Sequence, residues 1–211
     1  MAAEDHSGHL GAVYDAKAPD EIAAVYDKWA DTYEAEMRAA GYRHPSVALA
    51  LLARHLPIGA GPILDAGAGT GLVGEWLAII GYPDLEALDI SGGMLAVAER
   101  KGVYRALHKL ALGGDLPFAD RSFAAVLSAG VFTTGHVGAE ALDALIRITR
   151  PGGVLVITVK DTVWQGGFAA AVESLEASGR AALIEQTQPY VSMPGEAGTS
   201  PGRAVVLRVT P

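Results

Sequence analysis

The chain of 211 residues contains no cysteine. Disulfide bonds, thiolate metal ligands and cysteine nucleophiles are therefore excluded as sources of its stability or chemistry. No pair of carboxylates or histidines shows metal-ligand spacing either, so no metal is expected. Long apolar runs are also missing, and the first ten residues are polar and acidic, unlike a signal peptide. These features predict a cytoplasmic protein without a membrane partner.

Basic charge is scarce and scattered along the chain. The formal net charge is −8, and no run of Lys or Arg is longer than two residues. Sequence-independent binding of DNA or RNA depends on clustered basic side chains that neutralise phosphates. The composition therefore argues against a nucleic-acid partner and favours a small-molecule one.

Predicted strands and helices alternate through the middle of the chain. This order predicts an α/β fold of the Rossmann-like, doubly wound type, in which helices cover both faces of a mainly parallel sheet. The last two strands have no helix between them, so they are expected to pair antiparallel at one edge of a seven-stranded sheet. The predicted strands lie at 62–65, 85–89, 104–110, 123–128, 154–159, 182–188 and 204–209.

The N-terminal part is predicted to differ from this core. Residues 1–13 are expected to form a flexible tail, and no linker divides residues 14–211, which are expected to form one domain. Apolar residues recur at helical spacing over 19–40 and again over 46–56. These N-terminal helices are expected to lie over the functional site as a lid.

The most informative segment is Leu64-Asp65-Ala66-Gly67-Ala68-Gly69-Thr70-Gly71, which follows the first predicted strand. Its glycines let the backbone turn sharply and let a ligand approach without clashing with a Cβ atom. The helix that follows presents free N–H groups at its start, which suit an anionic group. A strand, a glycine turn and a helix in this order predict a nucleotide-type site at the carboxyl ends of a parallel sheet.

Two kinds of chemistry use such a loop. The string from Gly69 to Gly74 matches the dinucleotide pattern G-x-G-x-x-G, with Asp89 twenty residues further on, which is typical of an NAD(P)-dependent oxidoreductase. The other register begins with Asp65 at the strand end and continues with the three alternating glycines. This register fits the strand better, and it resembles the first motif of class I S-adenosylmethionine-dependent methyltransferases.

The resemblance to class I methyltransferases covers roughly residues 20–160. Asp89 matches the acid that ends the family's second strand and binds the ribose hydroxyls. Leu116-Pro117-Phe118 and the segment from Arg150 to Leu155 resemble the family's entries to its fourth and fifth strands. The combined spacing is more specific than any of these motifs alone.

A narrower resemblance comes from the N-terminal region. The stretch Tyr26-Asp27-Lys28-Trp29-Ala30, then Gly41-Tyr42-Arg43, with Ser128-Ala129-Gly130 and Gly135-His136-Val137, looks most like the methyltransferase-like group named for the Williams–Beuren syndrome region. The resemblance to this group implies no well-defined substrate.

The class I resemblance implies a cofactor, S-adenosylmethionine, which becomes S-adenosylhomocysteine, and a set of residues that hold it. Glycines of the loop are expected at its methionine part, the two acids at its ammonium and ribose, and aromatic residues over its sulfonium. The residues expected to bind it are Tyr26, Trp29, Tyr33, Asp65, Gly67, Gly69, Asp89, Ile90, Met94, Asp115, Leu116, Ser128 and Ala129.

The chain departs from the family near the adenine. Many class I methyltransferases carry an Asp four residues before the Leu-Pro-Phe string, and here that position is Leu112. Asp115 stands directly before Leu116 instead. Adenine recognition is therefore expected to shift to Asp115 or to backbone groups.

The candidate catalytic residues are His136, which follows the fourth predicted strand, and Tyr33. His136 also begins a predicted helix, so a structural role is an alternative. Similarly, Tyr26, Trp29 and Tyr33 fit ordinary core packing as well as a lid, because an apolar helical face commonly arises that way.

Three functions follow. The favoured one is methyl transfer from S-adenosylmethionine to a small-molecule acceptor, which needs alignment of donor and acceptor more than a dedicated base. The alternatives are an NAD(P)-dependent oxidoreductase and a non-catalytic binding module that retains the fold, because a fold alone does not establish chemistry. The acceptor and the oligomeric state are not determined by the sequence.

Overall fold

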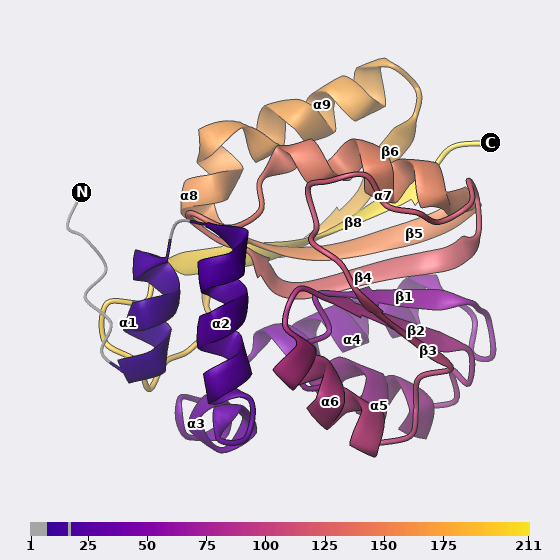
Figure 1. Cartoon of the computed structure of the whole chain (residues 1–211). Coiled ribbons are helices and arrows are strands. Elements are labelled where there is room, and N and C mark those ends of the chain that lie inside the picture. Colours follow the sequence, from indigo (N-terminus) through magenta and orange to yellow (C-terminus); the bar gives the residue numbers. More distant parts are fainter. Residues whose placement is uncertain (1–7, 17) are drawn as a thin grey trace.

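The centre of the molecule is a sheet, shown with its helices in the computed structural model of Figure 1, which describes residues 8–16 and 18–211. The described residues form eight strands in the order β3-β2-β1-β4-β5-β8-β6, with β7 paired to β8. Pairings among β1 to β5 are parallel, and β8 runs antiparallel to β5, β6 and β7. The strands are β1 (Ile63–Ala66), β2 (Leu85–Asp89), β3 (Ala106–Lys109), β4 (Phe123–Phe132), β5 (Thr149–Lys160), β6 (Ala181–Gln186), β7 (Tyr190–Val191) and β8 (Pro201–Val209).

This topology confirms the predicted mainly parallel α/β fold with an antiparallel edge. The sheet has one short strand more than the seven expected, because Tyr190–Val191 pairs with the start of β8. Two residues are too few to give a period-two pattern, so no sequence signal marked this strand.

Helices cover both faces of the sheet, with α4, α5 and α6 on one side and α7 and α9 on the other (Figure 1). The group α1 to α3 lies at one end of the sheet. The helices are α1 (Gly8–Asp15), α2 (Pro19–Trp29), α3 (Tyr33–Ala39), α4 (His44–His55), α5 (Leu72–Ile79), α6 (Gly92–Arg100), α7 (Leu142–Ile148), α8 (Asp161–Val163) and α9 (Ala169–Ala177), with short 3₁₀ and π segments at Ala139–Ala141 and Trp164–Phe168.

The central strands are mainly apolar because both faces of the sheet are buried. Along a strand, successive side chains point to opposite faces. Ile63 therefore joins the core under α4 and α5, while its neighbour Leu64 joins the core under α7 and α9. Val154 and Leu155 of β5 divide in the same way. Two cores, one on each face, hold the strands in a fixed plane.

The N-terminal region differs from the prediction in two respects. Residues 1–7 of the expected tail lie outside the described residues, but Gly8–Asp15 is helical and Val13 is buried. The helix expected over 19–40 is divided into α2 and α3 by a turn after Trp29. Trp29 Nε1 donates a hydrogen bond to Glu36 Oε2 at 2.8 Å, which joins the two helices across the bend. The continuous apolar pattern of this segment therefore spans two helices.

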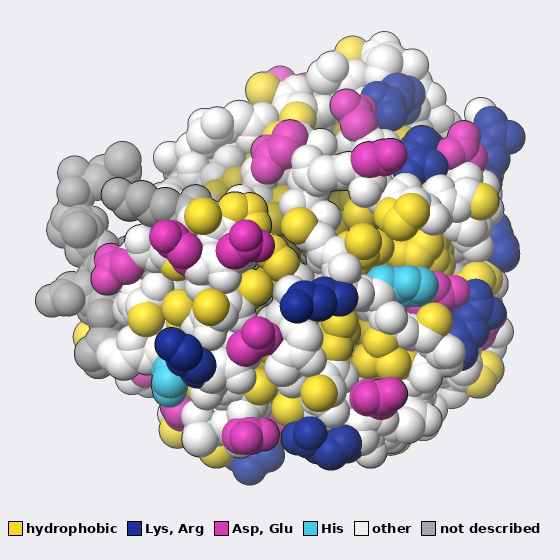
Figure 2. All heavy atoms as spheres, viewed as in Figure 1, with side chains coloured by type: hydrophobic (Ala, Val, Ile, Leu, Met, Phe, Trp, Pro, Cys, Tyr) yellow, Lys and Arg dark blue, Asp and Glu magenta, His cyan; other side chains and the backbone are white. Residues whose placement is uncertain are grey.

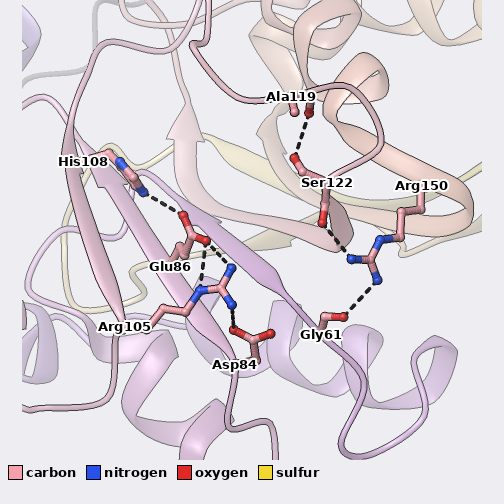
Figure 3. Close-up of polar contacts among 8 residues, drawn as sticks. All are labelled: Gly61, Asp84, Glu86, Arg105, His108, Ala119, Ser122 and Arg150. Carbon is pink, nitrogen blue, oxygen red and sulfur yellow. Dashed lines mark hydrogen bonds and ion pairs between the residues drawn. The ribbon is translucent and has the colours of Figure 1, made fainter.

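Polar contacts fasten the amino ends of the strands, opposite the carboxyl ends (Figure 3). Arg105 Nε donates to Glu86 Oε1 at 3.0 Å and so links β2 to the segment that leads into β3. Arg150 donates to the carbonyl oxygens of Gly61 at 3.1 Å and Ser122 at 3.0 Å. These residues stabilise the sheet and leave the carboxyl ends free for a ligand.

Within the described part of the chain, no helix is both long and apolar enough to cross a membrane.

Candidate active site

A cavity lies at the carboxyl ends of β1, β2 and β4, between the strand ends and helices α2 and α3. In a parallel sheet this edge is where loops and helix starts gather, and ligands of open α/β folds bind there. The lining residues are Pro19, Ile22, Tyr26, Tyr33, Gly67, Gly69, Leu88, Asp89, Ile90, Met94, Leu110, Ala111, Leu112, Ala129, Gly130, Val131, His136 and Val137.

The glycine loop forms the floor of this cavity. Gly67, Gly69 and Gly71 all have positive φ angles, of 83°, 54° and 81°, which side-chain-bearing residues rarely adopt. A Cβ atom at Gly67 would lie 2.1 Å from Val131 Cγ2, so only glycine lets the loop pack against β4. A Cβ at Gly69 would meet nothing within 4 Å. Gly69 therefore leaves open space where a ligand is expected.

Asp89, at the end of β2, holds the loop and also lines the cavity. Its Oδ2 accepts a hydrogen bond from Gly69 N at 2.8 Å, and its Oδ1 accepts one from Ser91 N at 2.9 Å. Burial raises the pKa of Asp89, while the bonds from Ser91 and Gly69 act in the opposite direction. A carboxylate can accept about four hydrogen bonds, so capacity remains for hydroxyl groups of a ligand.

Asp65 lies behind the loop, and it is not among the residues that line the cavity. Its Oδ2 accepts a hydrogen bond from the Tyr104 hydroxyl at 2.6 Å. Tyr104 packs against the start of α5, where a Cβ at Gly74 would lie 2.1 Å from its hydroxyl oxygen. Burial raises the pKa of Asp65 to about 7, and the charge of Asp89 adds to this effect. The structure thus separates the two acids that the sequence places at neighbouring strand ends.

The aromatic residues of α2 and α3 divide between the cavity and its support. Tyr26 and Tyr33 line the cavity, whereas Trp29 is buried and packs between them. The Trp29 ring lies 6.0 Å from that of Tyr26 and 4.9 Å from that of Tyr33. The two tyrosines thus lie where the predicted lid would be, and Trp29 fits the packing alternative.

Sequence reasoning gave Asp27 no role, yet this residue fastens the lid. Asp27 Oδ1 accepts hydrogen bonds from Ser91 Oγ at 2.6 Å and from Gly93 N at 2.7 Å. Ser91 is the N-cap of α6 and follows Asp89 by two residues. The signal that the sequence offered was the Ser91-Gly92-Gly93 string. Glycine is needed at position 93, because a Cβ atom there would lie only 2.9 Å from Asp27 Cα.

His136 lines the cavity, but both of its ring nitrogens have partners. Its Nδ1 lies 2.7 Å from Thr133 Oγ1, and its Nε2 lies 3.3 Å from the carbonyl oxygen of Val13. A carbonyl only accepts, so Nε2 carries the proton and Nδ1 accepts from the Thr133 hydroxyl. Burial lowers the pKa of His136. This arrangement fits the structural alternative, in which a neutral His136 anchors α1.

The remaining predicted residues fall into two groups. Ile90, Met94 and Ala129 line the cavity as expected. Ser128 is buried beside it and donates to the carbonyl oxygen of Ala66 at 2.7 Å. Ser128 therefore holds β4 to β1 in this structure.

The expected shift of adenine recognition to Asp115 is not what the structure shows. The Asp115 side chain is fully exposed and lies 3.9 Å from Arg147, and Leu116 is buried in the core under α7. The cavity wall is formed instead by Leu110, Ala111 and Leu112, directly after β3. Strand β3 ends at Lys109, so these residues stand at the ligand edge and Asp115 lies beyond it. The apolar character of residues 110–112 was the signal that sequence reasoning missed.

Among the described residues, no cluster of His, Asp and Glu is arranged to bind a metal ion.

The fold and the position of the cavity are typical of α/β proteins that bind a nucleotide-like ligand at the ends of parallel strands. A family model described as a methyltransferase domain matches residues 64–157. Methyltransferase-like protein 27 of Homo sapiens is 34% identical over 164 residues, which cover 73% of this chain and 65% of that protein. A demethylmenaquinone methyltransferase of Parafrankia sp. is 31% identical over a 216-residue alignment, covering 90% of this chain and 84% of the relative.

Solved structures of methyltransferases show the same fold. One is the 1,6-didemethyltoxoflavin-N1-methyltransferase of Burkholderia thailandensis with bound 1,6-didemethyltoxoflavin and S-adenosylhomocysteine, at 20% identity and a TM-score of 0.63. The alignment covers 92% of this chain and 91% of that chain. Another is a putative methyltransferase of Haloferax volcanii in complex with the activator Trm112, at a TM-score of 0.66, 20% identity and coverage of 88% and 96%.

The chain belongs to the class I S-adenosylmethionine-dependent methyltransferase family. It aligns with 65% of the length of methyltransferase-like protein 27 and with 59% of the length of a demethylmenaquinone methyltransferase of Renibacterium salmoninarum, in each case less than two thirds.

Proposed function

We propose that this protein transfers a methyl group from S-adenosylmethionine to a small-molecule acceptor. The observation that carries this proposal is one cavity that combines the glycine turn, the Asp89 carboxylate and apolar walls. The membership in the methyltransferase family supports it.

The residues of the cavity fit the adenosyl part of the cofactor. Asp89 has acceptor capacity for the two ribose hydroxyls, and Gly69 leaves open space beside it. Ile90, Met94 and Leu112 offer apolar surface for a flat base. When bound, S-adenosylmethionine supplies a methyl group that is already activated by the positive charge on its sulfur.

The contribution of the protein is then alignment and exclusion of water. Positioning of reactants supplies roughly 7–11 kcal/mol of barrier lowering in favourable cases. Tyr26 and Tyr33 cover the cavity from α2 and α3 and keep water out. Both ring nitrogens of His136 have hydrogen-bond partners, so His136 anchors α1 and does not act as a general base.

Two observations support a small-molecule acceptor. The names of the relatives refer to demethylmenaquinone and 1,6-didemethyltoxoflavin, which are small molecules. On the face drawn in Figure 2, Lys and Arg side chains are spread between acidic ones, and they form no broad basic surface there. The narrower resemblance to the Williams–Beuren group, and the cytoplasmic location, stay predictions.

The cofactor assignment is tested by isothermal titration with S-adenosylmethionine. Asp89→Ala is expected to weaken binding by about tenfold or more, because hydrogen bonds to a charged group contribute about 1.5–3 kcal/mol. Asp115→Ala is the matched control, since its side chain is exposed and lies outside the cavity, and its affinity is expected to equal that of the wild type. Equal affinity of Asp89→Ala and wild type would show that the cofactor site is assigned wrongly.

Two alternatives are separated by further measurements. Tight binding of NAD(P) without binding of S-adenosylmethionine would favour the oxidoreductase. The fold neighbours include the [4+2]-cyclase SpnF, with a TM-score of 0.65 and 16% identity, so the fold alone does not establish methyl transfer. Formation of S-adenosylhomocysteine in the presence of candidate acceptors tests catalysis directly. Cofactor binding without turnover across a broad acceptor panel would favour the non-catalytic module.

A further inference from the structure

Lys101 lies where three helices meet. It is the C-cap of α6, and its Nζ lies 2.7 Å from Glu34 Oε1 of α3 and 3.0 Å from Glu75 Oε2 of α5. Only 15% of its side chain is exposed, so salt screens these two ion pairs less than pairs on the open surface. The neighbouring pair of Asp31 with Arg100 is longer, at 3.6 Å, and lies on the surface. Lys101 is therefore the better-defined link between α6 and α3.

The two carboxylates around Lys101 belong to different parts of the molecule. Glu75 lies in α5, which packs on the sheet through the buried Leu77. Glu34 lies in the first turn of α3 and directly follows Tyr33, which lines the cavity of the proposed cofactor site. The same ammonium thus binds one carboxylate of a core helix and one carboxylate of the turn that carries a cavity residue.

Glu34 also lies close to the glycine loop. Burial acts to raise the pKa of Glu34, but Lys101 and the hydroxyl of Thr70 outweigh it and hold the pKa below its ordinary value. Thr70 stands between Gly69 and Gly71 in the loop and is completely buried. Glu34 is therefore charged at neutral pH, and it joins the start of α3 to the floor of the cavity.

We propose that Lys101 is a positioning residue for the cofactor. Through Glu34 it holds the first turn of α3, and with it Tyr33, against the glycine loop, so that this ion pair keeps the cavity closed around a bound cofactor. This inference rests on the proposed function. Opening of a lid limits the release of a ligand beneath it, so breaking the pair lets the cofactor leave faster. Glu75 attaches the same lysine to the core and takes no part in closing the cavity.

The test compares Glu34→Gln with Glu75→Gln, because each variant removes one carboxylate charge from the same ammonium. Each protein is loaded with labelled S-adenosylhomocysteine, and release is followed after a chase with an excess of the unlabelled compound. Glu34→Gln is expected to release the label about fivefold faster than the wild type, since a hydrogen bond between charged groups is lost. Glu75→Gln is expected to stay within about twofold of the wild type. Equal rates in the two variants would mean that Lys101 only caps α6, and the proposal would be wrong.

Substitutions of the lysine itself give an independent check. Lys101→Met is expected to release the label as fast as Glu34→Gln. The double variant of Glu34→Gln and Lys101→Met is expected to be no faster than either single variant, because both changes break the same pair. Lys101→Arg keeps the positive charge and is expected to recover the slow release. Effects that multiply in the double variant would show that the two residues act separately, which contradicts the proposal.

Hydrogen exchange separates a failure of this inference from a failure of the proposed function. Without any cofactor, the amides of α3 are expected to exchange faster in Glu34→Gln than in Glu75→Gln. A wild type that does not bind S-adenosylhomocysteine overturns the proposed function, and this exchange comparison still tests the ion pair. A wild type that binds it, with equal release and equal exchange in the two variants, overturns the role of Lys101 alone.

Discussion

At the scale of single residues, Asp65 and Asp89 show how two acids at adjacent strand ends acquire different roles. Asp89 accepts from the backbone of the glycine loop and lines the cavity. Asp65 accepts from the buried Tyr104 hydroxyl and has its pKa raised to about 7. The same residue type thus lines the cavity in one place and is a buried structural group with a pKa near neutral pH in the other.

The raised pKa of Asp65 predicts a loss of stability with increasing pH. From the ordinary value of 3.8 up to about 7, the native state keeps a proton on Asp65 that the unfolded state has lost. The free energy of unfolding therefore decreases as the pH rises through this window, in total by a few kcal/mol, since one pKa unit corresponds to about 1.4 kcal/mol. Asp65→Asn keeps an acceptor for Tyr104 but has no charge, so this part of the decrease is expected to disappear.

Urea unfolding at several pH values measures the difference between the wild type and Asp65→Asn. The exposed Asp20→Asn is the control and is expected to follow the wild type. Parallel stability curves for the wild type and Asp65→Asn would contradict a raised pKa in the folded protein.

At the scale of elements, the cofactor cavity depends on how α2 is held against α6. The lid helix has one polar attachment at the start of α6, where Asp27 accepts from Ser91 and Gly93. Ser91 also caps α6 by accepting from Met94 N at 3.0 Å. Helix α2 is therefore attached to the same turn that carries Asp89, so we expect the proposed lid and the proposed ribose site to be coupled.

Asp27→Ala is expected to loosen α2 and to weaken binding of S-adenosylhomocysteine about fivefold, because hydrogen bonds of this kind contribute about 1 kcal/mol net. Calorimetric titration gives the affinity, and hydrogen exchange is expected to become faster in the amides of α2. Asp31→Ala is the control, because the Asp31 side chain is 91% exposed. Its contact with Arg100, at 3.6 Å, lies on the surface. If Asp27→Ala changes neither the affinity for S-adenosylhomocysteine nor hydrogen exchange in α2, Asp27 does not hold α2 against α6.

At the scale of the whole molecule, the sheet separates stability from ligand binding. The amino ends of the strands carry the Glu86–Arg105 contact and the bonds of Arg150, whereas the carboxyl ends carry the cavity. Cores on both faces fix the distance between strand ends. The cavity at the carboxyl ends is thus supported by a sheet whose polar attachments lie at the opposite edge.

A ligand at this edge is expected to stabilise the whole molecule. S-adenosylhomocysteine at a hundred times its Kd adds about 2.7 kcal/mol to the free energy of unfolding. For a chain of this size, that gain raises Tm by roughly 5–10 °C. Differential scanning calorimetry is expected to show the shift in the wild type and a much smaller one in Asp89→Ala. A rise in Tm with NADP⁺ and none with S-adenosylhomocysteine would favour the dinucleotide register of the glycine loop.

The sequence by itself predicted the alternation of strands and helices in the middle of the chain and a ligand site at the end of the first strand. The alternation of apolar strands with helical patterns requires parallel pairing, and glycines with positive φ mark the turn where the first strand ends. Both signals are local, because they depend on backbone conformation and on spacing along the chain. Gly67, Gly69, Asp89 and the family resemblance could therefore be recognised without coordinates.

Only the tertiary structure decided which side chains meet. Asp27 contacts Ser91 across 64 positions, His136 contacts Val13 across 123, and His44 contacts Tyr190 across 146. Such pairs depend on how whole elements pack, and no local pattern encodes them. For the same reason the exclusion of Asp115 from the cavity and the position of Lys101 between Glu34 and Glu75 became visible only in three dimensions.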